Sequence, residues 1–168
     1  MNKLRDSQIS KVYKSELDVR YEIDNIGRNK FEKSFLSIEK TKISLQRILK
    51  SSWMKKYFPH VYCINIQLKD VRGNRRWARG GAYNIDLPLW ARREIVILHE
   101  LAHTILIRER ERYGQCASHG KEWAGIFMML LKRWNREVFE LMKISYYLNR
   151  VKWIKNYNKL YKLIKDLR

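Results

Sequence analysis

The chain has 168 residues, enough for one compact domain with a core of its own and too few for two unless both are small. It carries 36 Lys and Arg against 17 Asp and Glu, a formal net charge of +19. With 45% hydrophobic and 12% aromatic residues, the composition excludes a disordered basic tail, because enough apolar surface is present to form a core. We therefore expect a folded, strongly basic body with an anionic partner, most often nucleic acid or an acidic membrane surface. No membrane partner is expected here, because Tyr and Asn dilute the apolar face of the basic C-terminal segment.

The chain holds two cysteines, Cys63 and Cys116, too few for a disulfide framework or a four-cysteine zinc ribbon. Its first ten residues lack the apolar stretch of a secretory signal, and no window is long and apolar enough for a membrane span. We expect a soluble, intracellular protein of the cytoplasm.

The first fifty residues predict helices. Apolar residues recur at three-to-four spacing between Phe31 and Leu49, and a weaker amphipathic segment extends from about Leu4 to Ile23. Gly27 is expected to separate the two segments, and Ser51, Ser52 and Pro59 then mark a break.

After this break the hydrophobic period changes to two, which predicts a half-buried strand from Val61 to Lys69. A turn at Gly73 and Asn74 leads into a second short strand near residues 75–79, and a third is expected over residues 83–87. The pattern predicts a small three-stranded sheet.

Pro88 suits the first turn of a helix, and neither Pro nor Gly interrupts Leu89–Ile107, the predicted central helix. A charged loop is expected over residues 108–117, with Ser118 as the N-cap of the next helix. We predict an α+β fold in a single domain, 1–168. Its three parts are N-terminal helices (1–58), a sheet and metal-binding core packed on the central helix (59–134), and a basic C-terminal helical extension (135–168).

The central helix contains the sequence His99-Glu100-Leu101-Ala102-His103, an H-E-x-x-H motif. Histidines four residues apart project from one face of a helix, so both imidazoles can reach one zinc ion, while the glutamate beside the first can hold a water molecule. Apolar residues flank the motif on both sides, as a buried metal-binding helix requires. Two core histidines that form only hydrogen bonds are the alternative.

A catalytic zinc needs a third protein ligand and one open position. His119 lies 16 residues after His103, at the expected start of the next helix, and would complete an all-nitrogen site. Glu122, 19 residues after His103, is the alternative ligand.

These motifs resemble the SprT-like family of zinc metallopeptidases, which includes the Spartan proteases, and related small phage or bacterial metallohydrolases. The matching segments are Ile95–His103, Ser118–Trp123, Gly80-Gly81 and Ile85–Pro88, within about residues 75–134. The resemblance implies a zincin-like fold in which His99, His103 and His119 hold one Zn²⁺ ion. It also implies a protein substrate associated with DNA. The zinc ribbon that ends many family members is absent, and a basic segment stands in its place.

The expected mechanism follows from these ligands. Zinc would lower the pKa of a bound water, and Glu100, the catalytic residue, would take the proton and pass it to the leaving nitrogen. Tyr113, in the expected loop, is a candidate oxyanion donor, and an ordinary loop aromatic is the competing interpretation.

Basic side chains gather in two places, a predicted hairpin and the C-terminal segment, where aromatic rings that could stack on bases interleave with them. The residues expected to contact nucleic acid, with DNA favoured, are Arg72, Arg75, Arg76, Arg79, Arg150, Lys152, Lys155, Lys159, Lys162 and Lys165. In the C-terminal helix, Trp153, Tyr157, Leu160 and Ile164 would form an apolar stripe. Two alternative functions remain: a nucleic-acid-binding protein with a structural or relic zinc site, and a zinc hydrolase of a non-protein substrate.

Overall fold

The computed structural model describes residues 7–27, 37–71, 77–113 and 117–155, with the backbone alone for 109–113. The chain forms two compact units: residues 33–109, here the central unit, and residues 1–32 together with 110–168, here the terminal unit. Across the described residues, six α-helices and a three-stranded sheet make a mixed α+β fold, which confirms the predicted class. None of these helices is long and apolar enough to cross a membrane.

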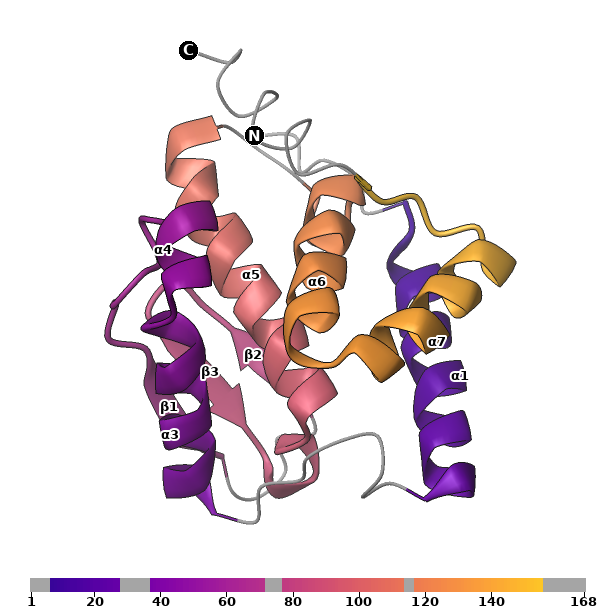
Figure 1. The fold of residues 1–168 in the computed structure, drawn as a ribbon, viewed down its shortest axis with the longest axis horizontal. Helices are drawn as coiled ribbons and strands as arrows, with labels where there is room; N and C mark the ends of the chain where they lie inside the picture. Colours follow the sequence, from indigo (N-terminus) through magenta and orange to yellow (C-terminus); the bar gives the residue numbers. More distant parts are fainter. Residues whose placement is uncertain (1–6, 28–36, 72–76, 114–116, 156–168) are drawn as a thin grey trace. The chain divides into compact units, whose positions relative to one another are not determined.

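Two serine-capped helices begin the central unit. Helix α3 (Ile38–Leu49) starts at Ser37, whose hydroxyl accepts a hydrogen bond from the backbone N–H of Lys40 at 3.2 Å. Helix α4 (Ser52–Tyr57) starts in the same way at Ser51. Such caps satisfy backbone donors that the first helical turn leaves unpaired. The buried side chains of α3 recur on one face, and α3 lies beside the sheet in Figure 1.

The sheet of the central unit contains β1 (Gln67–Asp70), β2 (Arg79–Gly80) and β3 (Asn84–Leu87) in the order β1-β3-β2. Strand β1 runs parallel to β3, with Leu68 opposite Ile85, while β2 pairs antiparallel with β3. The central strand is the buried one, since Ile85, Asp86 and Leu87 are all shielded from solvent. The three-stranded sheet was predicted correctly.

The first strand is shorter than the prediction of Val61–Lys69. The backbone N–H groups of Val61 and Tyr62 both bond the carbonyl of Phe58, which makes a turn, and Cys63 adopts a left-handed conformation with φ of 58°. A strand cannot pass through such a residue. The alternation of apolar and polar residues therefore includes residues whose backbone forms the turn after α4 and does not form a strand.

The predicted central helix also begins later. Residues Leu89–Ala91 form a 3₁₀ turn, and helix α5 runs from Glu94 to Tyr113 instead of from Leu89 to Ile107. The guanidinium of Arg92, nearly buried, pairs with Asp70 at the end of β1. This ion pair ties the segment before α5 to the sheet.

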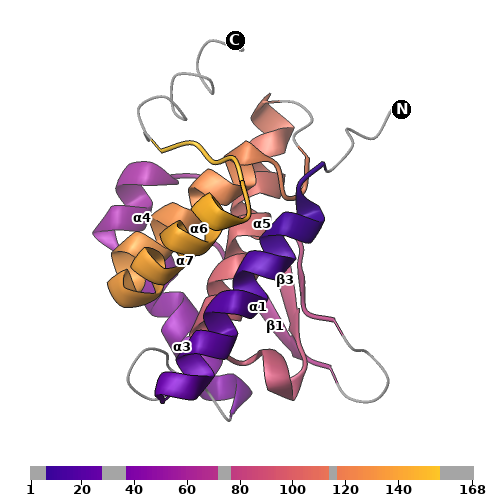
Figure 2. The same cartoon turned by 90° about the vertical axis from the view of Figure 1, so that its right-hand side faces the viewer.

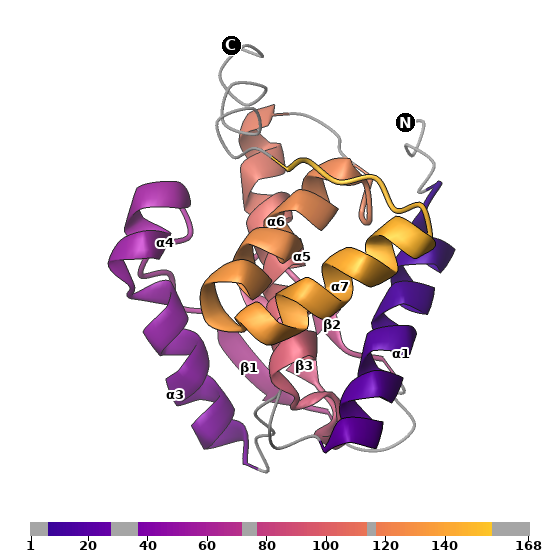
Figure 3. The ribbon, with the colours of Figure 1, turned by 45° about the vertical axis from the view of Figure 1, so that its right-hand side comes forward.

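The terminal unit is a group of helices: α1 (Ile9–Ile26), α6 (Lys121–Trp134) and α7 (Arg136–Leu148). Helix α7 contacts both α1 and α6, as Figures 2 and 3 show from two sides. Gly27 ends α1 with a positive φ of 114°, in agreement with its expected role as a separator.

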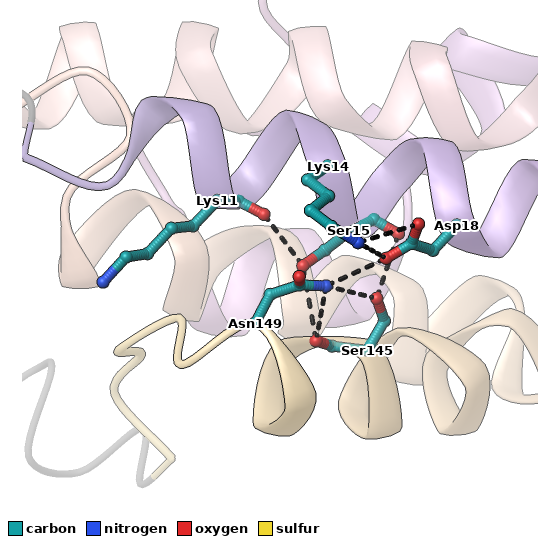
Figure 4. Close-up of polar contacts among 6 residues, drawn as sticks. All are labelled: Lys11, Lys14, Ser15, Asp18, Ser145 and Asn149. Atoms are coloured by element: carbon teal, nitrogen blue, oxygen red, sulfur yellow. Dashed lines mark hydrogen bonds and ion pairs between the residues drawn. The ribbon is translucent and has the colours of Figure 1, made fainter.

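Helices α1 and α7 meet through small and polar side chains (Figure 4). The hydroxyl of Ser145 donates to the carbonyl of Ser15 at 3.3 Å, and the hydroxyl of Ser15 donates to the carbonyl of Lys11 at 2.9 Å. The amide of Asn149 donates to the carboxylate of Asp18 at 3.0 Å. Lys14 and Asn149 both donate to this carboxylate, and these bonds hold the pKa of Asp18 below its ordinary value. We call this group the α1–α7 polar contact.

The sequence predicted a helix that includes Trp153, and this prediction is wrong for the residues that the structure describes. Helix α7 ends at Leu148, Arg150 turns left-handed with φ of 54°, and Val151–Lys155 is not helical. The N–H of Val151 bonds the carbonyl of Tyr146, and the N–H of Arg150 bonds that of Tyr147. These two bonds make a Schellman ending. Tyr157, Leu160 and Ile164 lie outside the described residues.

Candidate metal centre

The H-E-x-x-H motif lies on the most thoroughly buried helix of the central unit. Leu98, Leu101, Ala102 and Ile105 of α5 are fully buried around it. Strand β2 passes so close that a Cβ atom on Gly80 would lie 2.2 Å from the carbonyl oxygen of Glu100. The sheet therefore packs directly on the motif.

Thr104, next to the motif, fastens this helix to the β2–β3 turn. Its hydroxyl lies 2.8 Å from the carbonyl of Gly81, to which it donates, and 3.3 Å from the carbonyl of Glu100. The N–H of Gly81 bonds the carbonyl of Asn84 and closes the turn. Because Thr104 is buried, these bonds form away from water, and they fix the helix relative to the hairpin.

His99 and His103 face one another on α5, as their spacing predicts. Their Nε2 atoms are 3.1 Å apart and their ring centroids 4.9 Å apart. In a tetrahedral zinc site, Zn–N bonds of about 2.0–2.1 Å place two nitrogens roughly 3.4 Å apart. The pair thus has nearly the separation that one shared cation requires. Glu100, which follows His99 in the motif, is 6% exposed.

His119 belongs to the terminal unit and lies in the turn before α6. The N–H of Gly120 bonds the carbonyl of Ala117, and Gly120, not Ser118, is the N-cap of α6. His119 is only 4% exposed. Its ring contacts the rings of Tyr13 and Trp123, with centroids 5.0 and 4.8 Å away.

One ligand nitrogen from each of His99, His103 and His119 lies within 4.8 Å of the other two. Imidazole nitrogens are ligands that suit a borderline metal ion such as zinc. The residues thus fit the predicted group, and the three histidines can bind a metal ion.

Glu122, the alternative ligand, does not belong to this group. It lies in the first turn of α6, where its carboxylate is 3.9 Å from the ammonium of Lys121. Tyr113, expected in a loop, is instead the last residue of α5, and its side chain lies outside the described part of the chain.

Four of the ten residues expected to contact nucleic acid can be located. Arg79 on β2 and Arg150, Lys152 and Lys155 after α7 are all exposed. Arg72, Arg75, Arg76, Lys159, Lys162 and Lys165 lie outside the described residues.

Sequence reasoning missed two residues beside His119. Tyr13 supplies one of the rings against the imidazole, and the side-chain amide of Gln8 donates a hydrogen bond to the His119 carbonyl at 2.8 Å. Both residues come from the region of α1, over a hundred positions earlier, and neither belongs to a motif. The one available signal is weak: Gln8 is a polar residue at the start of an amphipathic segment.

Comparison with family models, curated proteins and solved structures finds no match for this chain.

Proposed function

We propose that this protein is a zinc-dependent metallopeptidase of the H-E-x-x-H type. The observation that carries the proposal is the convergence of the ligand nitrogens of His99, His103 and His119 within 4.8 Å, with Glu100 inside the motif. A zinc ion bound there would supply a Lewis acid that polarises the scissile carbonyl and acidifies water. The resemblance to the SprT-like family supports the same conclusion.

Glu100 is the residue to which we assign proton transfer. A carboxylate follows His99 directly in the chain, is 6% exposed, and is positioned by a helix that Thr104 and Gly80 hold against the sheet. It would take a proton from the attacking water and deliver it to the leaving amine nitrogen. A site that only stabilised the fold would have no use for a buried glutamate at this position.

A peptide substrate is favoured by the position of β2. Among the strands that the structure describes, β2 lies at the edge of the sheet, and its Gly80 is packed against the backbone of Glu100. An edge strand offers backbone donors and acceptors to an extended polypeptide. This arrangement supports a protein substrate over a small non-protein one.

The net charge of +19 supports a role at DNA, where the substrate proteins would be bound. The exposed Arg150, Lys152 and Lys155 are the described residues that we assign to phosphate contacts. The same charge also favours a second candidate, a nucleic-acid-binding protein whose metal site only stabilises the fold.

The deciding experiment compares zinc-loaded wild type with Glu100→Gln on a free protein substrate and on the same protein bound to DNA. We expect Glu100→Gln to retain zinc and to lose turnover by at least about 100-fold, because the general base is removed while the ligands remain. His119→Ala is the matched variant for metal loss and should lose both zinc and turnover. Turnover is followed by gel electrophoresis and zinc by elemental analysis.

Cleavage that persists unchanged in Glu100→Gln would contradict the proposal. Zinc bound tightly by a wild-type protein that cleaves neither substrate would favour the nucleic-acid-binding alternative. Full zinc content in His119→Ala with loss in Glu122→Ala would instead replace the third ligand.

A further inference from the structure

Gln8 forms a buried bridge between two distant segments of the terminal unit. Its amide nitrogen donates to the carbonyl of His119 at 2.8 Å and to the carbonyl of Lys152 at 3.0 Å. Its amide oxygen accepts from the N–H of Lys152 at 3.0 Å. Gln8 is 8% exposed, so both ends of a nearly buried amide are satisfied by backbone groups.

The bond to His119 matters because this histidine is not held by a helix. It lies in the turn between Ala117 and Gly120, before α6 begins, where no helical hydrogen-bond ladder fixes its backbone. The amide of Gln8 fixes the carbonyl of His119. The imidazole ring of His119 is held separately, by the ring of Tyr13 on α1 and the ring of Trp123 on α6.

We propose that Gln8 is a positioning residue for the third metal ligand, acting through the backbone of His119. The proposal rests on the three-histidine metal site of the proposed function. Hydrogen-bonding partners of metal ligands commonly contribute 10- to 100-fold to metal affinity. Here the bond would fix the backbone that carries the imidazole, so this backbone need not be ordered when the ion binds. The residue at the N-cap of α1 would thus help to position the third metal ligand.

Gln8→Met tests this directly, since methionine is close to glutamine in length and makes none of the three hydrogen bonds. We expect its zinc affinity, measured by competition with a chromophoric chelator, to fall about 10- to 100-fold. Bound cobalt(II) should give a changed visible spectrum, which reports the geometry of the ligand set. The matched control is Asn149→Ala, which removes hydrogen bonds to Asp18 and Ser145 in the same unit and should leave both readouts unchanged.

Zinc affinity in folded Gln8→Met equal to that of wild type would overturn the proposal, and so would an equal loss in Asn149→Ala. If Gln8→Met does not fold, amide hydrogen exchange in the wild-type protein tests the positioning role instead. If the Gln8 bridge favours zinc binding, then zinc binding must stabilise the bridge by the same free energy. The N–H of Lys152, which is bonded to Gln8, should therefore exchange more slowly when zinc is added. The same slowing at Asn149, outside the bridge, would overturn the proposal.

These readouts need no substrate, so the two hypotheses fail separately. Absent cleavage with a large zinc effect of Gln8→Met would reject the peptidase and keep the positioning role. Normal cleavage with no zinc effect would reject the positioning role alone.

Discussion

A side chain at position 80 would collide with the helix that carries the motif. A Cβ atom there would lie 2.2 Å from the Glu100 carbonyl oxygen and 3.1 Å from the Cβ of His103. Backbone cannot rotate away as a side chain can, so β2 or α5 would have to shift. We expect Gly80→Ala to lower the free energy of unfolding by about 1–3 kcal/mol, the usual cost of overpacking. Thermal unfolding measures the change as a lower Tm.

Gly81→Ala is the matched control for this substitution. Its Cβ would meet the amide oxygen of the Asn84 side chain at 2.7 Å, and this side chain can turn aside. The nearest backbone atom, the carbonyl oxygen of Asn84, would be 3.3 Å away, compared with 2.2 Å for the Cβ at position 80. The loss of stability should therefore be smaller in Gly81→Ala. An equal Tm for the two variants would contradict the close packing of Gly80 on α5.

At the scale of single residues, the sequence predicted those members of the site whose chemistry follows a local rule. His99 and His103 are four residues apart on one helix, which places their nitrogens together whatever surrounds them. His119 was favoured because a third imidazole would complete an all-nitrogen site, and the resemblance to a family motif implied the same ligand, while spacing alone left Glu122 open. Gln8 could not be predicted, because its bond to His119 joins residues 111 positions apart and depends on how the helices of the terminal unit pack.

At the scale of elements, the α1–α7 polar contact makes a pH-dependent contribution to stability. Hydrogen bonds from Lys14 and Asn149 hold the pKa of Asp18 below its ordinary value. A lowered folded pKa adds stability at pH values above the unfolded pKa, near 4, and this stability is lost as the pH falls through the folded pKa. We expect Asp18→Asn to lower the free energy of unfolding at pH 7 by less than about 1 kcal/mol, because the carboxylate is partly exposed. The difference should shrink as the pH falls below the unfolded pKa and disappear below the folded pKa, as urea unfolding at pH 7 and at a series of lower pH values would measure.

Glu140→Gln provides the comparison within one helix. Glu140 accepts a hydrogen bond from Lys143 three residues later, and this bond lowers the pKa of its carboxyl as well. It does not join two helices, so its substitution should have a smaller effect at pH 7. If the effect of Glu140→Gln on the free energy of unfolding depends on pH as strongly as that of Asp18→Asn, the link between α1 and α7 adds nothing to the stability that Asp18 provides.

Helix ends were predicted less well than helices, and the end of α7 explains why. The residue that adopts the left-handed conformation at a helix end is usually a glycine, as Gly27 is after α1. After α7 the left-handed residue is Arg150, and the buried pair Val151 and Tyr146 accompanies the turn. Asn149, directly after Leu148, is the weaker signal of such an ending, and no glycine marks it. The apolar stripe that includes Trp153 therefore predicted a helix beyond the residue at which tertiary packing ends α7.

At the scale of the whole molecule, the excess of positive charge and the metal centre are separate features of one chain. The motif helix is mostly apolar over residues 95–107, whereas residues 132–168 hold 11 Lys and Arg against 3 Asp and Glu. Charge of this kind governs where a protein binds and how fast it associates, and it does not determine the fold. A hydrolase that used it would bind DNA through one surface and cleave with another, so DNA affinity should survive the loss of zinc.

We expect DNA binding to weaken steeply with salt, because each phosphate contact releases bound counterions. A complex with six to ten such contacts loses about 10³- to 10⁵-fold in affinity between roughly 50 and 200 mM salt, which fluorescence anisotropy can follow. Lys152→Glu/Lys155→Glu should lower both the affinity and the salt dependence. Lys55→Glu/Lys56→Glu, on exposed positions of α4, changes the net charge equally and should leave the salt dependence near that of wild type. Equal losses in the two double variants would mean that the net charge acts as a whole, and an affinity independent of salt would exclude phosphate contacts as the source of binding.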